Sequence, residues 1–135
     1  LWSAQTTSPF LARDEPRVAV AAVLDGPSGH FTVCNTHLSF IPRWNSAQLR
    51  RLVRSLEGTR EPLVLMGDLN MQRRQAARAS GMTAIAAAPT FPAPRPARQL
   101  DHVLVRGPLR ATGPAEAVRL PLSDHRALVV PCAQD

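Results

Sequence analysis

The stretch "PLVLMGDLNM", residues 62–71, joins an apolar run to a pair of polar side chains. Leu63 to Gly67 are typical of a buried strand, because the run is short and apolar. Residues i and i+2 of a strand point to the same side, so Asp68 and Asn70 are expected to face outward together. Ligands of open α/β sheets usually bind at the carboxyl ends of strands. The stretch therefore predicts a strand that ends in a polar site; the alternative is a simple turn.

The composition indicates one globular domain. The chain has 135 residues, of which 44% are hydrophobic and 19% charged, which is not the composition of a disordered segment. No apolar run approaches the roughly 18 residues of a membrane-spanning helix. We expect no membrane span and a cytoplasmic location. Cys34 and Cys132 are too few for a disulfide framework, and Cys34 is expected to be a buried, reduced thiol.

The charge of the chain favours anionic partners. The formal net charge is +6, and all sixteen basic residues are Arg. A positive protein attracts phosphate-bearing molecules, including nucleic acid, and Arg can contact one phosphate through two hydrogen bonds. The alternative is an ordinary solvated surface.

Strands predominate in the predicted order of elements. Residues 1–15 show no periodicity and are expected to be irregular, and residues 84–98 are expected to form a loop because they are rich in proline. A hairpin turn is expected at residues 25–29. We predict strands at 17–24, 30–38, 63–67, 99–107, within 109–120 and at 125–131, and helices from Pro42 to Gly58 and at 72–80. The first helix carries an apolar stripe of Leu49, Leu52, Val53 and Leu56.

Polar residues gather at the ends of these strands. The clusters are Thr36-His37, Asp68-Asn70, Asp101-His102 and Asp124-His125. The histidines lack the short spacings of a zinc site, and no nucleophile elbow, phosphate-binding loop or dinucleotide fingerprint is present. Carboxylate and amide oxygens suit Mg²⁺ or Mn²⁺, and histidines beside them suit proton transfer and stabilisation of phosphate charge.

Five motifs carry a resemblance to a known family. "NTHL", "LMGDLN", "TFP", "LDHVLV" and "LSDH", in this order, resemble the endonuclease/exonuclease/phosphatase superfamily, which has the DNase I-like fold. The resemblance covers residues 17–131 and corresponds to the C-terminal half of a family domain. It implies an α/β fold, a layered β-sandwich with flanking helices, of which about one half is present. Residues 1–135 would then be a single partial domain, without the N-terminal half that supplies the family's metal-binding Glu.

The resemblance also implies roles for the strand-end carboxylates. Asp68 is similar to the family's Asp that orients or deprotonates the attacking water, with metal ligation as the alternative. Asn70 is similar to the amide that holds a phosphate oxygen, and Asp124 to a carboxylate on the metal side. The implied ligands of Mg²⁺ or Mn²⁺ in this chain are Asp124, Asp68 and Asn70.

The histidines have different expected roles. His125 is similar to the imidazole at the scissile phosphate, and Asp101 to the carboxylate that orients it. His37 is similar to a second histidine near the leaving group, whose usual acidic partner belongs to the missing half. His30 and His102 have no role in these motifs and are expected to be surface or structural residues.

The resemblance implies metal-assisted hydrolysis of a phosphoester, by water attacking in line at phosphorus. The substrate class stays open between nucleic acid, phospholipid head groups and small phosphoesters. Because one half of the domain has no counterpart, we expect this chain alone to be weakly active or inactive. The uncovered sheet face would also favour self-association. The alternative function is a non-catalytic half-domain that binds a partner.

Overall fold

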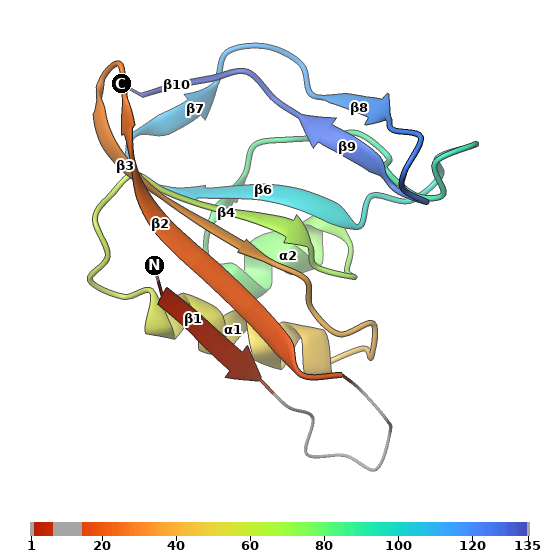
Figure 1. Ribbon diagram of the computed structural model, residues 1–135, viewed down its shortest axis with the longest axis horizontal. Coiled ribbons are helices and arrows are strands. Elements are labelled where there is room, and N and C mark those ends of the chain that lie inside the picture. Colours follow the sequence, from red (N-terminus) through yellow and green to blue (C-terminus); the bar gives the residue numbers. More distant parts are fainter. Residues whose placement is uncertain (1, 7–14, 135) are drawn as a thin grey trace.

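The centre of the protein is a mixed six-stranded sheet (Figure 1). The computed structural model describes residues 2–6 and 15–134. The strands are Trp2–Thr6 (β1), Arg17–Gly26 (β2), Gly29–Thr36 (β3), Leu63–Asp68 (β4), Thr83–Ala84 (β5) and Asp101–Arg106 (β6). They lie in the order β1-β2-β3-β4-β6-β5. Only β3 and β4 run parallel among these neighbours, and the remaining pairs are antiparallel.

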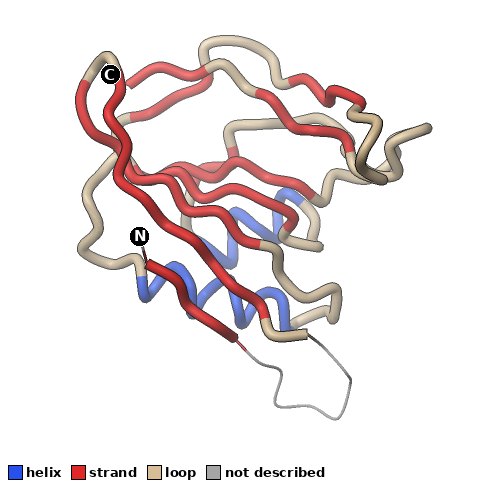
Figure 2. Tube along the Cα trace, in the orientation of Figure 1, coloured by secondary structure: helices blue, strands red, loops and turns tan. Residues whose placement is uncertain are grey.

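Helices cover one face of the sheet, and two small β ladders lie over the other (Figures 1 and 2). The helices are Trp44–Ser55 (α1) and Arg73–Ser80 (α2). The ladders pair Leu109–Ala111 (β7) with Cys132–Gln134 (β10), and Glu116–Arg119 (β8) with Arg126–Val129 (β9). This arrangement confirms the predicted layered α/β fold.

No helix in the described part of the chain has the length and apolar character that crossing a bilayer would require.

The core lies between the sheet and the helices. Cys34, Leu65 and Leu104 are register neighbours across β3, β4 and β6, and all three are fully buried. Burial raises the pKa of the Cys34 thiol to about 11, which favours the neutral thiol that the sequence predicts. The predicted stripe of α1 completes this core with Leu49, Leu52 and Leu56.

Three short strands were not predicted. β1 falls within the segment that was expected to be irregular, and it pairs with β2 from Trp2 opposite Ala21 to Thr6 opposite Arg17. Its sequence, WSAQT, lacks the apolar alternation of a half-buried strand, so no periodicity predicts it. The strand is defined by its backbone pairing to the edge of β2. Strands β5 and β10 extend over only 2 and 3 residues, too few for a periodicity to be visible.

The face of β2 that points away from the helices is apolar and exposed. Val18, Val20 and Leu24 are 43%, 48% and 44% exposed, whereas Ala19 and Ala21 between them are buried. The ladders approach the central sheet at β6, on the far side of β4 from β2. An apolar cavity of about 630 Å³ lies between the ladders and strands β3, β4 and β6. Among the described residues, the β2 side of this face therefore presents an apolar surface.

Gly67 allows the ends of β3 and β4 to approach closely. It has a φ of +130°, and a Cβ at this position would overlap the carbonyl oxygen of Thr36 and lie 2.8 Å from Asn35 Oδ1. Just beyond, the Leu38 N–H donates to the Asp68 carbonyl oxygen at 2.9 Å. A side chain at residue 67 would therefore separate the two segments that carry His37 and Asp68.

We expect Gly67→Ala to lower the free energy of unfolding by about 3 kcal/mol or more, because backbone strain and steric overlap act together. The matched control is Gly58→Ala, since Gly58 also has a positive φ of +79° but has nothing within 4 Å of a new Cβ. Its expected cost is about 1 kcal/mol, from the backbone alone. Urea unfolding of both variants measures the difference, and equal losses would contradict the steric argument.

Candidate active site

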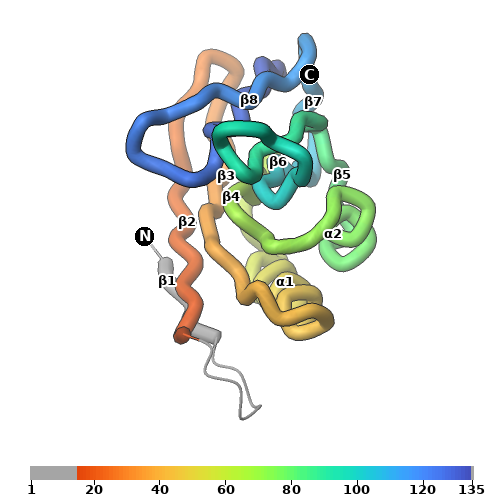
Figure 3. The backbone as a smooth tube through the Cα atoms, turned by 90° about the vertical axis from the view of Figure 1, so that its right-hand side faces the viewer, coloured from red at the N-terminus to blue at the C-terminus, as the bar shows by residue number. Residues whose placement is uncertain are grey.

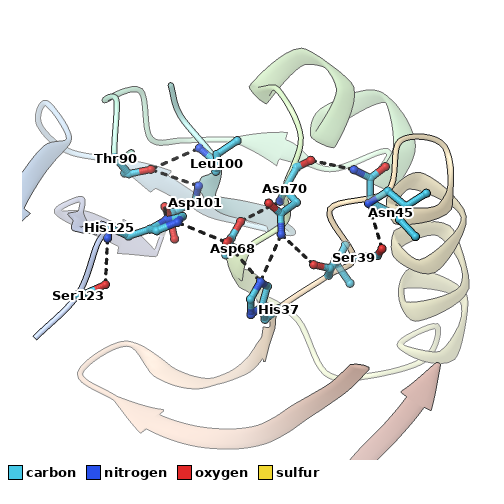
Figure 4. A network of polar contacts seen from close by, with 12 residues as sticks. His37, Ser39, Asn45, Asp68, Asn70, Thr90, Leu100, Asp101, Ser123 and His125 are labelled. Atoms are coloured by element: carbon cyan, nitrogen blue, oxygen red, sulfur yellow. Dashed lines mark hydrogen bonds and ion pairs between the residues drawn. The ribbon is translucent and has the colours of Figure 1, made fainter. Parts of the chain in front are cut away.

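Neighbouring strand ends bring the predicted residues together. β4 and β6 are antiparallel with Asp68 opposite Asp101, so the two carboxylates lie side by side at one end of the sheet. His37 follows the end of the parallel neighbour β3. His125 lies directly before β9 and reaches the same place from the other layer (Figure 4). Four segments that are distant in sequence thus converge.

The Asp68 carboxylate lies at the centre of the cluster. Its Oδ1 accepts a hydrogen bond from the Asn70 backbone N–H at 2.9 Å. Its Oδ2 lies 3.4 Å from His37 Nε2 and 3.7 Å from His125 Nε2. The Asp68 side chain is only 16% exposed. One largely buried carboxylate therefore faces two imidazoles.

Asn70 is held in place from both sides. The residue has a φ of +50°, a left-handed conformation that Asn tolerates better than most residues. Its side-chain Nδ2 donates to the Leu38 carbonyl oxygen at 3.0 Å and lies 3.3 Å from His37 Nε2. Its backbone carbonyl oxygen accepts from Asn45 Nδ2 at 2.8 Å. The amide is therefore positioned before any ligand arrives.

The expected contact between Asp101 and His125 is confirmed. Asp101 Oδ2 lies 2.8 Å from His125 Nδ1, and both side chains are 21% exposed. This pairing places the proton of the neutral imidazole on Nδ1 and turns Nε2 toward Asp68. His125 is thus oriented by one carboxylate and faces another.

The loop at residues 90–98 fixes His125 from its other side. Thr90 is fully buried, its hydroxyl accepts weak hydrogen bonds from the Leu100 and Asp101 N–H groups, and its carbonyl accepts from the Arg126 N–H. The Phe91 ring lies 4.8 Å from the His125 ring, centroid to centroid, at a tilt of 45°. This contact places Phe91 beside the site.

A cavity of about 660 Å³ opens onto these groups. Asp124 lines it, as the sequence predicts, and its side chain is exposed. Four further residues line the cavity that the sequence did not assign to the site: Glu15, Arg17, Phe40 and Ser123. Arg17 could have been found from the hairpin pairing, because the start of β2 must lie beside the end of β3.

The remaining histidines lie elsewhere, as expected. His102 points to the helix side of the sheet, is 1% exposed, and contacts the Met71 carbonyl oxygen at 2.8 Å through Nε2. His30 lies in the β2–β3 hairpin, where it pairs with Asp25 on the surface. Neither lines the cavity.

Burial and neighbouring charges shift two pKa values in the cluster. Burial raises the pKa of Asp68 above its ordinary value, and the Asp101 charge raises it further, against lowering by the Asn70 hydrogen bond and both imidazoles. Burial alone lowers the pKa of His125, but the hydrogen bond to Asp101 and the charges of Asp101, Asp68 and Asp124 raise it overall. These directions suit a carboxylate that accepts a proton and an imidazole that carries one.

The residues present do not by themselves form a complete metal site. Within residues 2–6 and 15–134, no group of three or more His, Cys, Asp or Glu is arranged to hold a metal ion. Asp68 already has partners for both carboxylate oxygens. Mg²⁺ requires near-octahedral oxygen ligation, and the predicted set of Asp124, Asp68 and Asn70 supplies few free oxygens. The metal-ligand roles of these residues stay predictions.

The fold and the site together define a class. A layered α/β protein with Asp, Asn and His at adjacent strand ends fits the phosphoester hydrolases that the sequence motifs resemble. Residues 3–125 match the sequence profile of the Endonuclease/Exonuclease/phosphatase family. The chain belongs to this family.

Solved structures agree on the fold. A functionally unknown conserved protein from Enterococcus faecalis V583 superposes with a TM-score of 0.78 at 18% identity, over 100% of this chain and 66% of that one. The mannosyl-6-phosphatase Bt3783 from Bacteroides thetaiotaomicron VPI-5482 gives 0.68 at 16% identity, over 93% and 60%. D. rerio TDP2, complexed with single strand DNA product, gives 0.70 at 15% identity, over 99% and 68%. The chain thus spans about three fifths to two thirds of these structures. No functionally curated protein matches the sequence.

We expect Asp101→Asn to lower the pKa of His125, because the variant removes both the hydrogen bond to a carboxylate and the nearest negative charge. NMR titration of the His125 imidazole measures the shift. Asp124→Asn should lower the pKa less, since Asp124 acts through charge alone. A His125 pKa that is the same in wild type and Asp101→Asn would remove Asp101 as its orienting partner.

Proposed function

We propose that this site hydrolyses phosphoester bonds by in-line attack of water at phosphorus. The observation that carries the proposal is the Asp68 carboxylate facing two imidazoles, one of which is oriented by Asp101. Phosphodiesters and phosphomonoesters both fit this chemistry. The mannosyl-6-phosphatase and TDP2 neighbours, as named, act on or bind phosphate-bearing molecules.

Asp68 is the proposed base. Its raised pKa makes it a better proton acceptor than an exposed Asp, and its Oδ2 faces the cavity beside both histidines. It orients the water molecule and accepts one of its protons, so that the hydroxide oxygen can form the bond to phosphorus. The Asn70 N–H on Oδ1 keeps the other oxygen in place during this step.

The two histidines act on the phosphate from different sides. His125, which is protonated more readily than an ordinary His, donates from Nε2 to a non-bridging phosphate oxygen and stabilises the developing charge. His37 gives a proton to the leaving oxygen as the phosphorus–oxygen bond breaks. The Asn70 amide, held next to His37, donates to a second phosphate oxygen once substrate displaces the His37 contact.

Divalent-metal dependence is a separate part of the proposal, based on the family resemblance. Because the described residues lack a three-ligand group, we infer that binding of Mg²⁺ or Mn²⁺ needs an acidic ligand from outside them. The missing N-terminal half of a family domain is the proposed source. When bound, the ion would supply charge stabilisation at the phosphate.

A second candidate is a non-catalytic module that binds a partner or a second copy. The apolar face at Val18, Val20 and Leu24 favours it, because an uncovered sheet face is suited to association. This candidate predicts no turnover under any condition, so the assays below separate it from the hydrolase.

We expect His125→Ala to lower phosphoester turnover by about 100-fold or more, since it removes a positioned proton donor. Bis(p-nitrophenyl) phosphate reports phosphodiesterase activity, and p-nitrophenyl phosphate reports phosphomonoesterase activity. The control is His30→Ala, which removes an imidazole of the hairpin that does not line the cavity. If wild type hydrolyses the ester and the two variants do so at equal rates, His125 has no part in the mechanism.

We expect this chain to bind Mn²⁺ or Mg²⁺ weakly, and to be less active than a version extended at its N-terminus. Calorimetric titration with each metal and turnover with metal or chelator are measured on both proteins. Chelator should abolish the activity of the extended protein. If the short chain equals the extended one in affinity and rate, the residues present are sufficient and the inference of an outside ligand is wrong.

A further inference from the structure

Helices α1 and α2 carry a concentration of positive charge. Each contributes three arginines, and neither contains Asp or Glu. The two helices lie beside one another on the same face of the sheet (Figures 2 and 3). Amphipathic packing explains their apolar residues, but it does not require that every charged residue on the outer side be positive. The question is whether these charges are only solvated or form a site.

Three of the arginines line one groove between the helices. The groove has a volume of about 390 Å³, and its polar lining consists of Arg50, Arg74, Arg78, Ser46, Gln72 and Gln75. A hydrogen bond of 2.9 Å from Gln75 Nε2 to Ser46 Oγ joins the two helices there. None of the described residues that line the groove is acidic. A fixed concave surface with only positive and neutral polar groups is suited to an anion.

The three guanidinium groups are available for a ligand. Arg50, Arg74 and Arg78 are exposed, and no ion pair joins them to a carboxylate among the residues that the structure describes. In contrast, Arg73 donates to the Ala84 carbonyl oxygen at 2.6 Å, and Arg106 pairs with Glu61. Like charges held in one groove repel one another, and a phosphate relieves that repulsion through bidentate contacts.

A second cavity neighbours both the groove and the active-site cavity. This cavity, of about 450 Å³, shares Gln72 and Gln75 with the arginine groove and Asn70 with the active-site cavity. Arg73 and Arg98 also line it, and its lining within residues 2–6 and 15–134 includes no acidic residue. The acidic side chains gather instead in the cavity that holds Asp68. The three cavities therefore neighbour one another in series, from the proposed reaction centre to the arginine groove, and we call this series the path.

We propose that this path binds the sugar-phosphate backbone of a polynucleotide strand, with one phosphate at Asp68 and a more distant part of the strand on Arg50, Arg74 and Arg78. The inference rests on the proposed function and narrows its substrate class. A small phosphoester would fill only the active-site cavity, whereas a chain of phosphates can occupy all three. Recognition through the backbone agrees with the described lining of the groove, which includes no aromatic side chain on which bases could stack.

An anionic membrane fits these observations less well. Membrane-surface helices present exposed apolar or aromatic residues beside their basic ones. The large exposed apolar residues lie on other segments, at Val18, Val20, Val23, Leu24, Phe40, Val118, Leu120, Leu122 and Val129. The arginines of α1 and α2 also line a concave groove, which a strand can enter more readily than a flat surface can.

The test compares two variants of equal charge. Arg50→Gln/Arg74→Gln/Arg78→Gln removes the groove charges, and Arg51→Gln/Arg60→Gln/Arg119→Gln removes three exposed charges that line none of the three cavities. Binding of a fluorescein-labelled oligothymidylate of about 12 nucleotides is measured by anisotropy over a range of salt concentrations. Oligouridylate of the same length compares RNA with DNA, and thermal unfolding verifies that both variants are folded.

We expect the groove variant to bind oligothymidylate at least about tenfold more weakly than wild type. The control variant should lose much less affinity for the same oligonucleotide. The slope of log K against log salt should decrease in magnitude by about 2, because three phosphate contacts on a single strand are lost. Equal losses in the two variants would show a general charge effect and overturn the proposal. Groove-dependent binding to phosphatidylserine vesicles, with no binding of either oligonucleotide, would also overturn it in favour of a membrane.

The same experiment separates this inference from the proposed function. Binding of oligothymidylate requires no turnover, so groove-dependent binding supports the path even if neither this chain nor the protein extended at its N-terminus hydrolyses a nitrophenyl ester. That combination would refute the hydrolase and leave the groove as a binding surface. Turnover of the small esters without groove-dependent binding would support the hydrolase and refute the path.

Discussion

The close approach of β3 and β4 at Gly67 is the constraint on which the rest of the site depends. The missing Cβ lets the β4 backbone lie against the Thr36 carbonyl oxygen, and the Leu38–Asp68 hydrogen bond keeps the chains together beyond the strands. The β4–β6 register then places Asp101 opposite Asp68. Because side chains alternate along a strand, both carboxylates point away from the helices, toward the layer that supplies His125.

That register places two acidic side chains next to each other, which is unfavourable unless a positive group separates them. His125 has this position, since Nδ1 contacts Asp101 and Nε2 faces Asp68. Burial first, and then the charge of Asp101, raises the pKa of Asp68; the hydrogen bond to Asp101 and the negative charges of the carboxylates raise the pKa of His125 against the lowering by burial. One arrangement therefore produces both a better proton acceptor and a more readily protonated imidazole. The rise in the pKa of His125 stabilises the folded state at pH values below the ordinary pKa of His, and this stabilisation disappears as the pH rises through the folded-state value.

The sequence predicted the elements whose residues alternate or repeat regularly, and missed those defined by pairing alone. The α1 stripe, the β2–β3 hairpin and the end of α2 at Gly81 all follow from local patterns, whereas β1 exists because β2 offers an edge. The site shows the same limit. Asp68 and Asn70 were expected to share a strand face, but β4 ends at Asp68 and Asn70 has a positive φ. They come together through an Asx turn, in which the Asp68 carboxylate accepts from the Asn70 backbone. Arg17 was missed because its nearness to the site depends on strand register, which composition does not reveal.

The two histidines of the site differ in how firmly they are held. His125 has a carboxylate at 2.8 Å, a ring contact with Phe91 and only 21% exposure, so its orientation is fixed by the fold. His37 is 60% exposed, and its Nε2 lies between the Asn70 amide at 3.3 Å and Asp68 at 3.4 Å. In the tautomer with a bare Nε2 it accepts from Asn70, and in the tautomer with the proton on Nε2 it donates toward Asp68, so its contacts depend on its tautomer. A proton donor to a leaving group needs one fixed direction, which for His37 must come from substrate or from a further part of the protein. The half of the site built on Asp101 and His125 is therefore organised by this chain, whereas the half around His37 is completed by what binds to it.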